Sequence, residues 1–370
     1  MATAFDIHQF DDSIVIPALH SQLGFALDTE FPVSGKPYFS APDIDLSLYH
    51  KIIIFMSAGK DSLACLLHLI DLGVDLSKVE LWHHLVDGAP GESDLMDWAF
   101  SDSYNRAVAD AFNLRLLRSW VEGGLEAEMM KFEAYSKPHK VETPDGLITL
   151  ARDTRRAKPN TRRRFPQQSG NLQTRYCSSV AKIDVGRRAL NNQSRFDDQN
   201  VLVVSGERRL ESANRAKYNQ FSPHVCDRRN GRKGRLVDEW RPVLHWDESQ
   251  VWQKLKDHRV IAPVPYRLGW GRFSCASCIF SSPKIWATIE RYFPERAYRI
   301  AMREGLFGTT ISRNKINVLQ QAALAEPLEI EDLEALEQAT KREYSLPVFV
   351  PEGQAWKLPV GAFSSEGCGS

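Results

Sequence analysis

The chain has 370 residues, of which 43% are hydrophobic, so it is long enough for two or three domains with a sizeable core. Lys and Arg together equal Asp and Glu at 47 each, which excludes a chain that is basic throughout, and any surface for nucleic acid must be local. There is no apolar stretch of membrane-spanning length and no N-terminal leader pattern, and the six cysteines are widely spaced. We expect a cytoplasmic protein with reduced thiols, no membrane contact and no secreted disulfide framework.

Residues 1–48 contain four prolines and no regular apolar period, which predicts a lead-in that packs on the following domain. The stretch 51–70, KIIIFMSAGKDSLACLLHLI, is more informative. Its apolar run 52–56 predicts a buried strand of a parallel sheet, and the i, i+3, i+4, i+7 spacing of leucine and isoleucine over 63–70 predicts a helix with one buried face. Because open α/β sheets bind ligands at the carboxyl ends of their strands, we expect the turn between these elements to face a ligand.

The turn itself, SAGKDS, predicts a phosphate-binding loop. It combines backbone N–H groups at a helix N-terminus with two hydroxyls, an unhindered glycine and a lysine. It is not a Walker A loop, because Ile54 and Asp61 stand where that motif has Gly and Ser or Thr. It resembles the SGGKDS pyrophosphate loop of the N-type ATP pyrophosphatases, which split ATP between its α and β phosphates; the alternative is an ordinary polar turn. The nucleotide-binding residues predicted here are Ser57, Ala58, Gly59, Lys60, Asp61 and Ser62, and Lys60 and Asp61 are also candidate catalytic residues.

A second strand is predicted at 79–86, followed by the turn pair Asp87-Gly88. An acidic residue at this position can bind a ribose hydroxyl or a magnesium ion, so Asp87 is a candidate nucleotide ligand; an Asp-Gly turn without function is the alternative. A helix over 94–112 and a third strand over 114–120 are predicted next. The alternation of strand and helix predicts an α/β fold with a doubly wound parallel sheet.

The segment 121–174 interrupts this alternation, and we expect it to be a basic, largely loop insertion. Its sequence RDTRRAKPNTRRR predicts a surface for a polyanionic substrate, while a merely solvated charge run is the alternative. The arginines proposed for substrate or nucleic-acid binding in this segment are Arg155, Arg156, Arg162, Arg163 and Arg164.

A further buried strand is predicted at 201–205, and it leads into GERRLESANR. Gly206 allows close approach of a ligand to the backbone, which makes it a nucleotide-binding candidate. Arg208 and Arg209 bring charge to the carboxyl end of the strand and are candidate catalytic residues, and Arg215 is a candidate substrate contact.

The segment 239–280 contains a helix that Asp247 is expected to cap, and then the pair Cys275 and Cys278. The C-x-x-C spacing suits one metal ion or one edge of a cluster. The region 283–370 is predicted to be mainly helical with an irregular, proline-containing tail, so the catalytic domain is expected to span 49–282.

Together, the loop, GERRLES, RPVLHWDESQVW and CASC resemble the phosphoadenosine-phosphosulfate (PAPS) reductase family over about residues 51–292. The resemblance implies a Rossmann-type, adenine nucleotide alpha hydrolase-like fold. It also implies that Cys177, at the family's position for a cluster cysteine, joins Cys275, Cys278 and, as a fourth ligand, Cys226 around a [4Fe–4S] cluster, with zinc or idle thiols as alternatives. The sequence departs from the adenosine-phosphosulfate reductases in having Ser178 where they have a second adjacent cysteine.

The function that this resemblance implies is ATP pyrophosphatase chemistry with Mg²⁺, in which a substrate oxygen is adenylated and then replaced by sulfur. The sulfur would come from a persulfide on an enzyme cysteine or from a cysteine desulfurase. Given the basic segments, the chain is most similar in type to the Dnd and Ssp DNA-phosphorothioation proteins, with DNA as substrate. The alternatives are a PAPS reductase, a tRNA-thiolating enzyme and a non-catalytic nucleic-acid-binding protein. The residues around Cys368 match the C-terminal cysteine motif of the PAPS reductases poorly. The sequence makes no prediction of oligomeric state.

Overall fold

The computed structural model describes residues 31–273 and 275–366, so most of the predicted lead-in and Cys368 lie outside the described residues. The described residues form one eight-stranded sheet in the order β5-β4-β3-β2-β1-β6-β8-β7. The strands are β1 (Lys51–Phe55), β2 (Val79–Leu85), β3 (Arg115–Val121), β4 (His139–Thr143), β5 (Gly146–Leu150), β6 (Asn200–Val204), β7 (Phe221–Pro223) and β8 (Leu236–Trp240).

The five central strands β3, β2, β1, β6 and β8 are parallel, and antiparallel strands flank them on both edges. The doubly wound parallel sheet is therefore confirmed, as are the predicted strands at 52–56, 79–86, 114–120 and 201–205. The short β7 and the partly polar β8 were not predicted, because neither carries the uniformly apolar run on which the other predictions depended.

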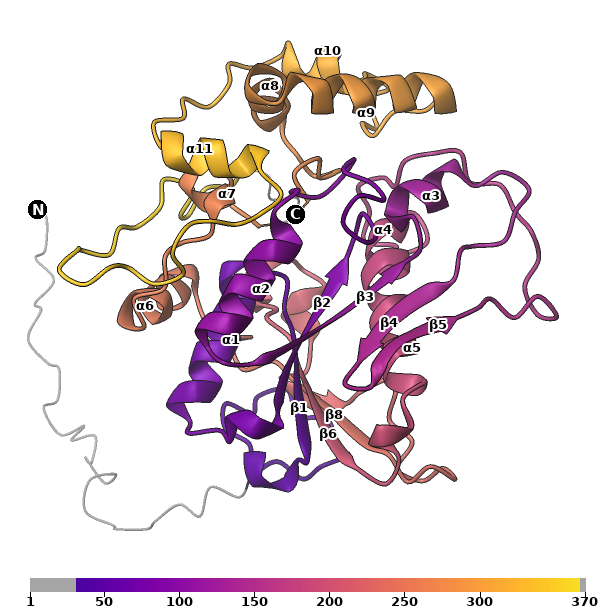
Figure 1. Cartoon of the computed structure of the whole chain (residues 1–370), viewed down its shortest axis with the longest axis vertical. Helices are drawn as coiled ribbons and strands as arrows, with labels where there is room; N and C mark the ends of the chain where they lie inside the picture. The colour runs from indigo at the N-terminus through magenta and orange to yellow at the C-terminus, as the bar shows by residue number, and fades with distance from the viewer. Residues whose placement is uncertain (1–30, 274, 367–370) are drawn as a thin grey trace, which may run out of the picture. The chain divides into compact units, whose positions relative to one another are not determined.

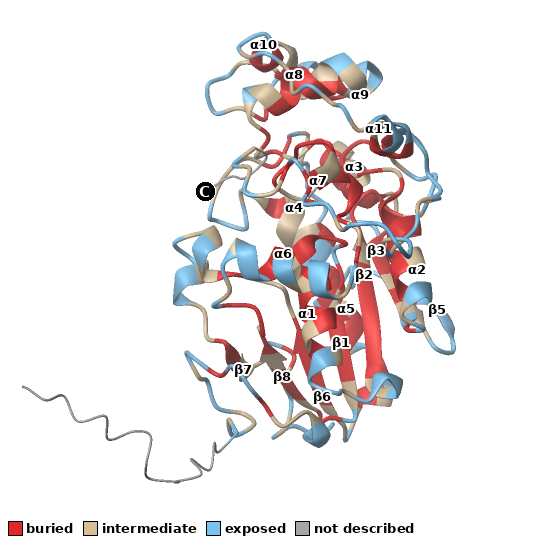
Figure 2. Cartoon of the chain, turned by 90° about the vertical axis from the view of Figure 1, so that its left-hand side faces the viewer, coloured by how far each residue is buried: buried red, intermediate tan, exposed pale blue. Residues whose placement is uncertain are grey.

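Helices cover both faces of the sheet, and the sheet separates two hydrophobic cores, one on each face. Ile52 and Ile54 of β1 lie in the larger core, whereas Ile53, which points to the opposite face, lies in a second core. Figure 2 shows the central strands as buried. The helices nearest the sheet are α1 (Lys60–Asp71), α2 (Ser101–Ala111), α5 (Asp184–Asn191) and α6 (Glu248–Asp257).

One prediction about local structure was wrong and another was incomplete. The helix predicted over 94–112 begins only at Ser101, because 94–100 forms turns that Asp87 holds through the backbone of Met96 and Asp97. The insertion 121–174 is largely loop, as expected, but it also contains α3 (Gly124–Met130) and the hairpin β4–β5, which extends the sheet beyond β3. The hairpin was missed because its strands are short and half exposed, with little apolar signal.

Cys177 lies at the start of a composite helix. The short α4 (Tyr176–Ser178) continues as a π-helical turn, η3 (Ser179–Ile183), and then as α5. Single π-helical turns inside helices are rare and are frequent at functional sites. The 3₁₀ turns elsewhere are η1 (Leu46–Leu48), η2 (Leu76–Lys78), η4 (Ser194–Phe196), η5 (Arg209–Glu211) and η6 (Arg215–Lys217).

The described residues 283–366 contain four helices, as expected of a helical C-terminal extension, but irregular segments make up more than half of them. Figure 1 shows α8, α9 and α10 as a group beyond the end of the sheet toward which β2 points. No helix in the described part of the chain has the length and apolarity needed to span a bilayer. The helices of this region are α7 (Val264–Arg267), α8 (Pro283–Tyr292), α9 (Pro294–Phe307), α10 (Val318–Ala322) and α11 (Leu333–Thr340).

Candidate active site

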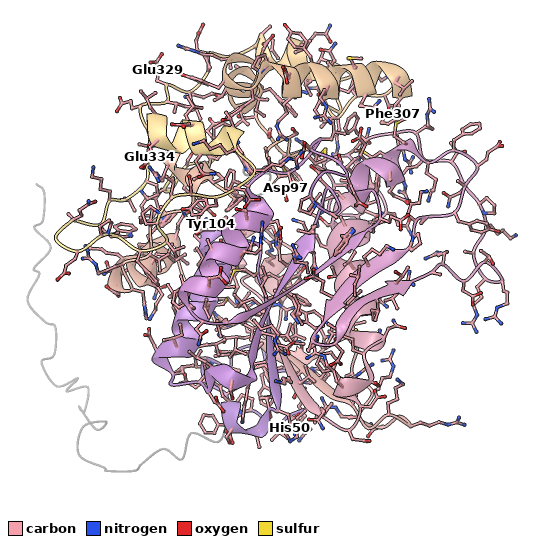
Figure 3. The ribbon with its side chains drawn as sticks, in the orientation of Figure 1. His50, Asp97, Tyr104, Phe307, Glu329 and Glu334 are labelled. Carbon is pink, nitrogen blue, oxygen red and sulfur yellow. The ribbon has the colours of Figure 1, made fainter. Side chains whose placement is uncertain are left out.

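A cavity of about 430 Å³ lies at the carboxyl ends of β1, β2 and β6, where the predicted loop was expected to face a ligand. Its wall includes Ser57, Gly59, Asp61 and Ser62 from the turn before α1, and Gly206 from the turn after β6. In Figure 3, His50, which precedes β1, and Asp97, which lines the cavity, lie at opposite ends of the sheet. The fold thus brings the loop to the edge of the sheet at which open α/β folds bind ligands.

The loop is held in one conformation by local bonds. Ala58 is buried and has a φ of 66°, in the left-handed region that glycine occupies more easily. The Ser62 hydroxyl donates to the Gly59 carbonyl oxygen over 2.9 Å, and the Tyr266 hydroxyl accepts from the Lys60 N–H over 3.1 Å. The other N–H groups of the first turn have no intrahelical acceptor, as at any helix start, and are suited to an anion.

Lys60 does not line the cavity, in contrast to the expectation that its charge converges on the phosphates. Its ammonium is 3% exposed and lies 3.6 Å from carboxylate oxygens of both Asp61 and Glu248. It also lies 5.2 Å from the centre of the Tyr266 ring. Burial alone would lower the pKa of Lys60, yet Tyr266, Asp61 and Glu248 raise it above its ordinary value. Lys60 is therefore placed to hold the loop in position from behind.

Asp61 and Arg208 form the link between the two turns of the site. The Arg208 Nε donates to Asp61 Oδ1 over 2.6 Å, and Arg208 is only 5% exposed. Burial would raise the pKa of Asp61, but Lys60 and Arg208 hold it below its ordinary value. A Cβ on Gly206 would lie 2.7 Å from the backbone carbon of Asp61, so only glycine allows the β6 turn to approach α1 this closely.

Glu248, at the start of α6, was not predicted and completes this network. Its carboxylate lies near the ammonium of Lys60 and 4.0 Å from Nη2 of Arg208, and it accepts from the Trp252 indole N–H and the Phe363 backbone N–H. The predicted capping of α6 by Asp247 is confirmed. A lone glutamate one position after a cap gives no sequence signal for this role, because its partners lie on other elements.

Asp87 lies behind the cavity wall and not on it. Its Oδ2 accepts from the backbone N–H groups of Met96 and Asp97, each over 2.8 Å, while its buried Oδ1 has no partner among the described residues. Burial, and then the nearby charge of Asp97, raise the pKa of Asp87 to about 7. Asp97, which does line the cavity, is thus better placed than Asp87 to contact a ligand.

Arg209 and Arg215 point in different directions. The Arg209 guanidinium stacks on the Phe39 ring at 3.7 Å and donates to two backbone carbonyl oxygens, so the structure does not bring it to the cavity. Arg215 lines the cavity and pairs with Glu211, which also lines it. Of the two predicted catalytic arginines, only Arg208 belongs to the site's network.

The arginines of the basic insertion do not form one surface. Arg155 and Arg156 are about 90% exposed, and within the described residues each forms an ion pair with Asp153. Arg162 pairs with the buried Glu128 over 2.9 Å and stacks on Tyr176 at 4.0 Å. Arg163 lies over the ring of Phe307, the last residue of α9; Figure 3 labels Phe307. The backbone carbonyl oxygen of Arg164 accepts a hydrogen bond from the Tyr176 hydroxyl. Arg155, Arg156 and Arg164 are therefore the exposed members of the five, and the bond of Arg164 is made by its backbone carbonyl oxygen and not by its guanidinium group.

The four predicted cysteine ligands are divided between two places. Cys177, Cys275 and Cys278 line one end of the same cavity as the loop. Cys226 is completely buried in the second core on the other face of the sheet, where its thiol contacts the Asn191 side chain and the Arg187 carbonyl oxygen. Cys226 is therefore not placed to share a metal ion or cluster with the other three.

The described residues contain no group of three or more His, Cys, Asp or Glu side chains arranged to hold a metal ion. A tetrahedral zinc site or a four-cysteine cluster therefore does not fit the cysteines as they are placed, because a structural zinc site or a cubane cluster takes four protein ligands. Five cysteines among the described residues are free thiols, and these include the three at the cavity.

Lys182, on the π-helical turn, lies at the cysteine end of the cavity and was not predicted. Its electrostatic neighbours are Cys275, Asp97, Cys177 and Cys278. The i→i+5 bonding of a π-helical turn places residues five apart nearly on one side, which is the separation of Cys177 and Lys182. The sequence signal that would have found Lys182 is thus this five-residue spacing, which an α-helical period of 3.6 hides.

Comparison with known proteins supports part of the expected resemblance. Residues 145–280 match the family model described as "Phosphoadenosine phosphosulfate reductase domain". The match includes β6, β8, Cys177 and the C-x-x-C pair, and leaves out the loop at 57–62. This match supports the adenine nucleotide alpha hydrolase-like class.

A second similarity is to a phage protein. The chain is 28% identical over 145 residues to the "Uncharacterized 37.8 kDa protein in gpa 5'region" of Escherichia phage 186. The match covers 39% of this chain and 40% of the phage protein, so the chain spans about two fifths of that relative's length. Neither similarity tests the closer resemblance to the Dnd and Ssp proteins.

Proposed function

We propose that the protein is an ATP pyrophosphatase that adenylates a substrate oxygen, releases pyrophosphate and prepares the same position for sulfur transfer. The single observation that carries this proposal is that residues of the SAGKDS loop and three free cysteines line the same cavity. A nucleotide held by the loop and a sulfur nucleophile held by a cysteine would then meet in one enclosed space.

In the proposed mechanism, the N–H groups of the first turn of α1 and the hydroxyls of Ser57 and Ser62 hold the β and γ phosphates. The network of Lys60, Asp61 and Arg208 fixes the loop for this task, so that its donors need no rearrangement when charge develops on the leaving pyrophosphate. Magnesium, bound mainly through the phosphates and with Asp61 as the carboxylate of the loop, would neutralise part of that charge. The substrate oxygen attacks the α phosphate, and AMP later leaves with that oxygen.

We propose the DNA backbone as the acceptor, and a cysteine desulfurase as the source of sulfur. The support for DNA is the exposure of Arg155 and Arg156, which pair with Asp153 in the described part of the chain. Exposed guanidinium groups bind phosphate oxygens and release counterions, which gives salt-dependent affinity. Arg162 pairs with Glu128 and Arg163 lies over Phe307, so the proposed DNA contact involves fewer of the five arginines than the sequence alone indicated.

The pyrophosphatase half is tested by incubating the protein with ATP, Mg²⁺ and an oligonucleotide and separating the products. AMP and pyrophosphate are expected, whereas ADP and phosphate would exclude the proposal. Product that carries sulfur in the phosphate backbone, found by mass spectrometry after nuclease digestion, distinguishes DNA modification from sulfur in a tRNA base.

The DNA contact is tested with the double variant Arg155→Ala/Arg156→Ala. We expect weaker binding of duplex DNA and a salt dependence of log K reduced by about 1 for each phosphate contact that is lost. Arg115→Ala is the matched control, since Arg115 is exposed at the start of β3, at the opposite end of the strand from the cavity. Equal salt slopes for the double variant and the wild type would exclude this contact.

PAPS reduction is a second candidate function. It is favoured by the match to the family model and by the position of Glu366, near the C-terminus, beside Gly271. The Gly271 N–H donates to the Glu366 carbonyl oxygen over 2.9 Å, and the adjacent Arg272 lines the cavity. Cys368, two positions further along, lies outside the described residues. Thioredoxin-dependent release of sulfite from PAPS that is lost in Cys368→Ser would favour this candidate over ATP cleavage.

A further inference from the structure

Two segments of the insertion lie side by side and form an arm outside the sheet. Residues 131–137 follow α3 and residues 151–161 follow β5, and Figure 1 shows the loops after these two elements extending outward on the right of the view. The Ala134 N–H donates to the Asn160 carbonyl oxygen over 3.2 Å, and the Asn160 N–H donates to the Ala134 carbonyl oxygen over 3.0 Å. We refer to residues 131–137 and 151–161 as the arm.

The base of the arm is fixed to the rest of the fold by charged side chains. The buried ammonium of Lys131 lies 2.6 Å from a carboxylate oxygen of the buried Glu128, on α3. Arg188, on α5, donates to the carbonyl oxygens of Leu150 and Ala151 over 3.0 and 2.9 Å. The arm is therefore held at its base, while most of its residues face solvent.

Two aromatic rings of the arm are exposed. Phe132 is 61% exposed and Tyr135 is 38% exposed, and neither ring packs against another aromatic ring or a cation among the described residues. Single apolar side chains on a surface are common and need no explanation. Two rings three residues apart on a backbone that is hydrogen-bonded to a second segment form a small apolar platform, and the charge around them indicates what it fits.

The surroundings of the two rings are basic. The arm has five exposed cations and two exposed carboxylates, and one of these carboxylates, that of Asp153, already pairs with two of the cations. Exposed rings beside an excess of cations match a polyanion that also has flat, unpaired rings, which is the chemistry of single-stranded nucleic acid. The exposed cations are Lys137, Arg152, Arg155, Arg156 and Lys158, and the exposed carboxylates are Glu133 and Asp153.

The arm leads to the wall of the cavity. Arg162, the residue after the arm, stacks on the Tyr176 ring at 4.0 Å and pairs with Glu128. Tyr176 lies between Arg175 and Cys177, both of which line the cavity. A strand bound along the arm therefore passes close to the space in which the nucleotide is expected.

We propose that the arm binds unpaired DNA, with Phe132 and Tyr135 stacked on its bases and the exposed cations at its phosphates. This inference rests on the proposed function, because it specifies the form of the DNA substrate. In a duplex the base faces are covered by neighbouring base pairs, so a duplex offers the arm its phosphates but no free ring. The cavity of about 430 Å³ has the size of a small-molecule site, which suits one nucleotide of an unpaired strand better than a duplex.

The test measures binding of the full chain to labelled DNA by fluorescence anisotropy. The three probes are an oligo(dT) strand of about 12 nucleotides, an abasic strand of the same length and a duplex. The wild type is expected to bind oligo(dT) most tightly. Phe132→Ala/Tyr135→Ala should weaken binding of oligo(dT) by about tenfold or more and change the affinity for the duplex by less than about twofold.

Three further variants separate stacking from other contacts. Phe132→Leu/Tyr135→Leu keeps apolar side chains without an aromatic face and should lose as much affinity for oligo(dT) as the alanine variant. Arg155→Ala/Arg156→Ala should weaken binding of all three probes, since all of them carry phosphates. Tyr298→Ala is the matched control, because Tyr298 is a 52% exposed aromatic residue on α9, outside the arm, and it should bind like the wild type.

Several outcomes would overturn the proposal. Equal affinity of the wild type for oligo(dT) and the abasic strand would show binding through phosphates alone, and the exposed rings would then fit a protein partner better. Full affinity of the leucine variant would exclude stacking, and equal losses for oligo(dT) and duplex in the alanine variant would exclude a preference for unpaired bases. The substituted rings are exposed, so a failure to fold is not expected to obscure these results.

The two proposals fail in different assays. Ring-dependent binding of oligo(dT) by a protein that releases no pyrophosphate from ATP would exclude the proposed function alone. Release of pyrophosphate by a protein that binds oligo(dT) and the abasic strand equally would exclude this inference alone.

Discussion

The two ends of the cavity satisfy their charges in opposite ways. At the loop end, Lys60, Asp61, Arg208 and Glu248 pair with one another and are largely removed from solvent. At the cysteine end, Lys182 is exposed and has no hydrogen bond or ion pair within the described part of the chain. Groups that already have partners are suited to holding a backbone in place, and groups that lack them are available to a ligand. The residue type alone does not distinguish the two lysines, whereas their partners do.

The largest effect is expected from Asp61, because it joins both cations of the loop end. Asp61→Asn should lower the rate of pyrophosphate release by about 10²–10³-fold, since the loop's donors lose their fixed orientation. Asp247→Asn is the control, because asparagine caps a helix as well as aspartate does and Asp247 is exposed. A rate for Asp61→Asn within twofold of wild type would mean that the network does not orient the loop.

Lys60→Ala distinguishes a supporting lysine from a phosphate ligand. Removing this buried ammonium leaves Asp61 and Glu248 with Arg208 as their remaining cation, and the free energy of unfolding should fall by about 3–5 kcal/mol. Urea unfolding measures this loss, and the KM for ATP of the protein that remains folded should rise less than about tenfold. An unchanged unfolding free energy combined with a much larger KM would show that Lys60 reaches the phosphates.

Asp87→Asn tests the acid behind the cavity wall. Since the pKa of Asp87 is raised to about 7 in the folded state, this group favours folding below its unfolded pKa, and that contribution is lost as the pH rises through about 7. Between pH 5 and pH 7 the wild type should lose stability relative to Asp87→Asn by up to about 1.4 kcal/mol per pH unit. Unfolding curves at several pH values measure the difference, with the exposed Asp75→Asn as control. The charge of Asp97 contributes to the raised pKa of Asp87, and the charge of Arg296 opposes it. Parallel profiles of stability against pH for the wild type and Asp87→Asn would contradict the raised pKa.

Ala58→Gly should give the smallest effect. The left-handed φ of 66° strains an alanine by about 1–2 kcal/mol, and part of the relief is offset by the greater entropy of glycine in the unfolded chain. A gain of about 0.5–1 kcal/mol in unfolding free energy is therefore expected. Ala64→Gly, inside α1, should instead destabilise the protein by about 1 kcal/mol. A loss of stability in Ala58→Gly would show that the alanine methyl group contributes more by packing than it costs in strain.

The elements that could be predicted from sequence are those whose signal is local. The apolar run and the leucine period around SAGKDS predicted β1, the turn and α1, because a buried parallel strand and an amphipathic helix each impose their own period on neighbouring residues. The same reasoning located β2, β3 and β6 and hence the edge at which a ligand binds. It failed for the β4–β5 hairpin, whose register depends on pairing with β3 and not on its own apolar content.

The sequence by itself therefore determined the fold class, the position of the SAGKDS loop at the carboxyl end of β1 and the cysteines worth considering. Only the tertiary structure decided which side chains meet, because ion pairs such as Asp61 with Arg208 join residues far apart in the chain. It placed Lys60 and Arg209 away from the cavity, separated Cys226 from the other three cysteines, and brought Lys182 to them through a π-helical turn. The physical reason is that the spacing of apolar residues indicates which face of a helix or strand is buried. The partner of a charged side chain or a thiol depends instead on how helices and strands pack against one another.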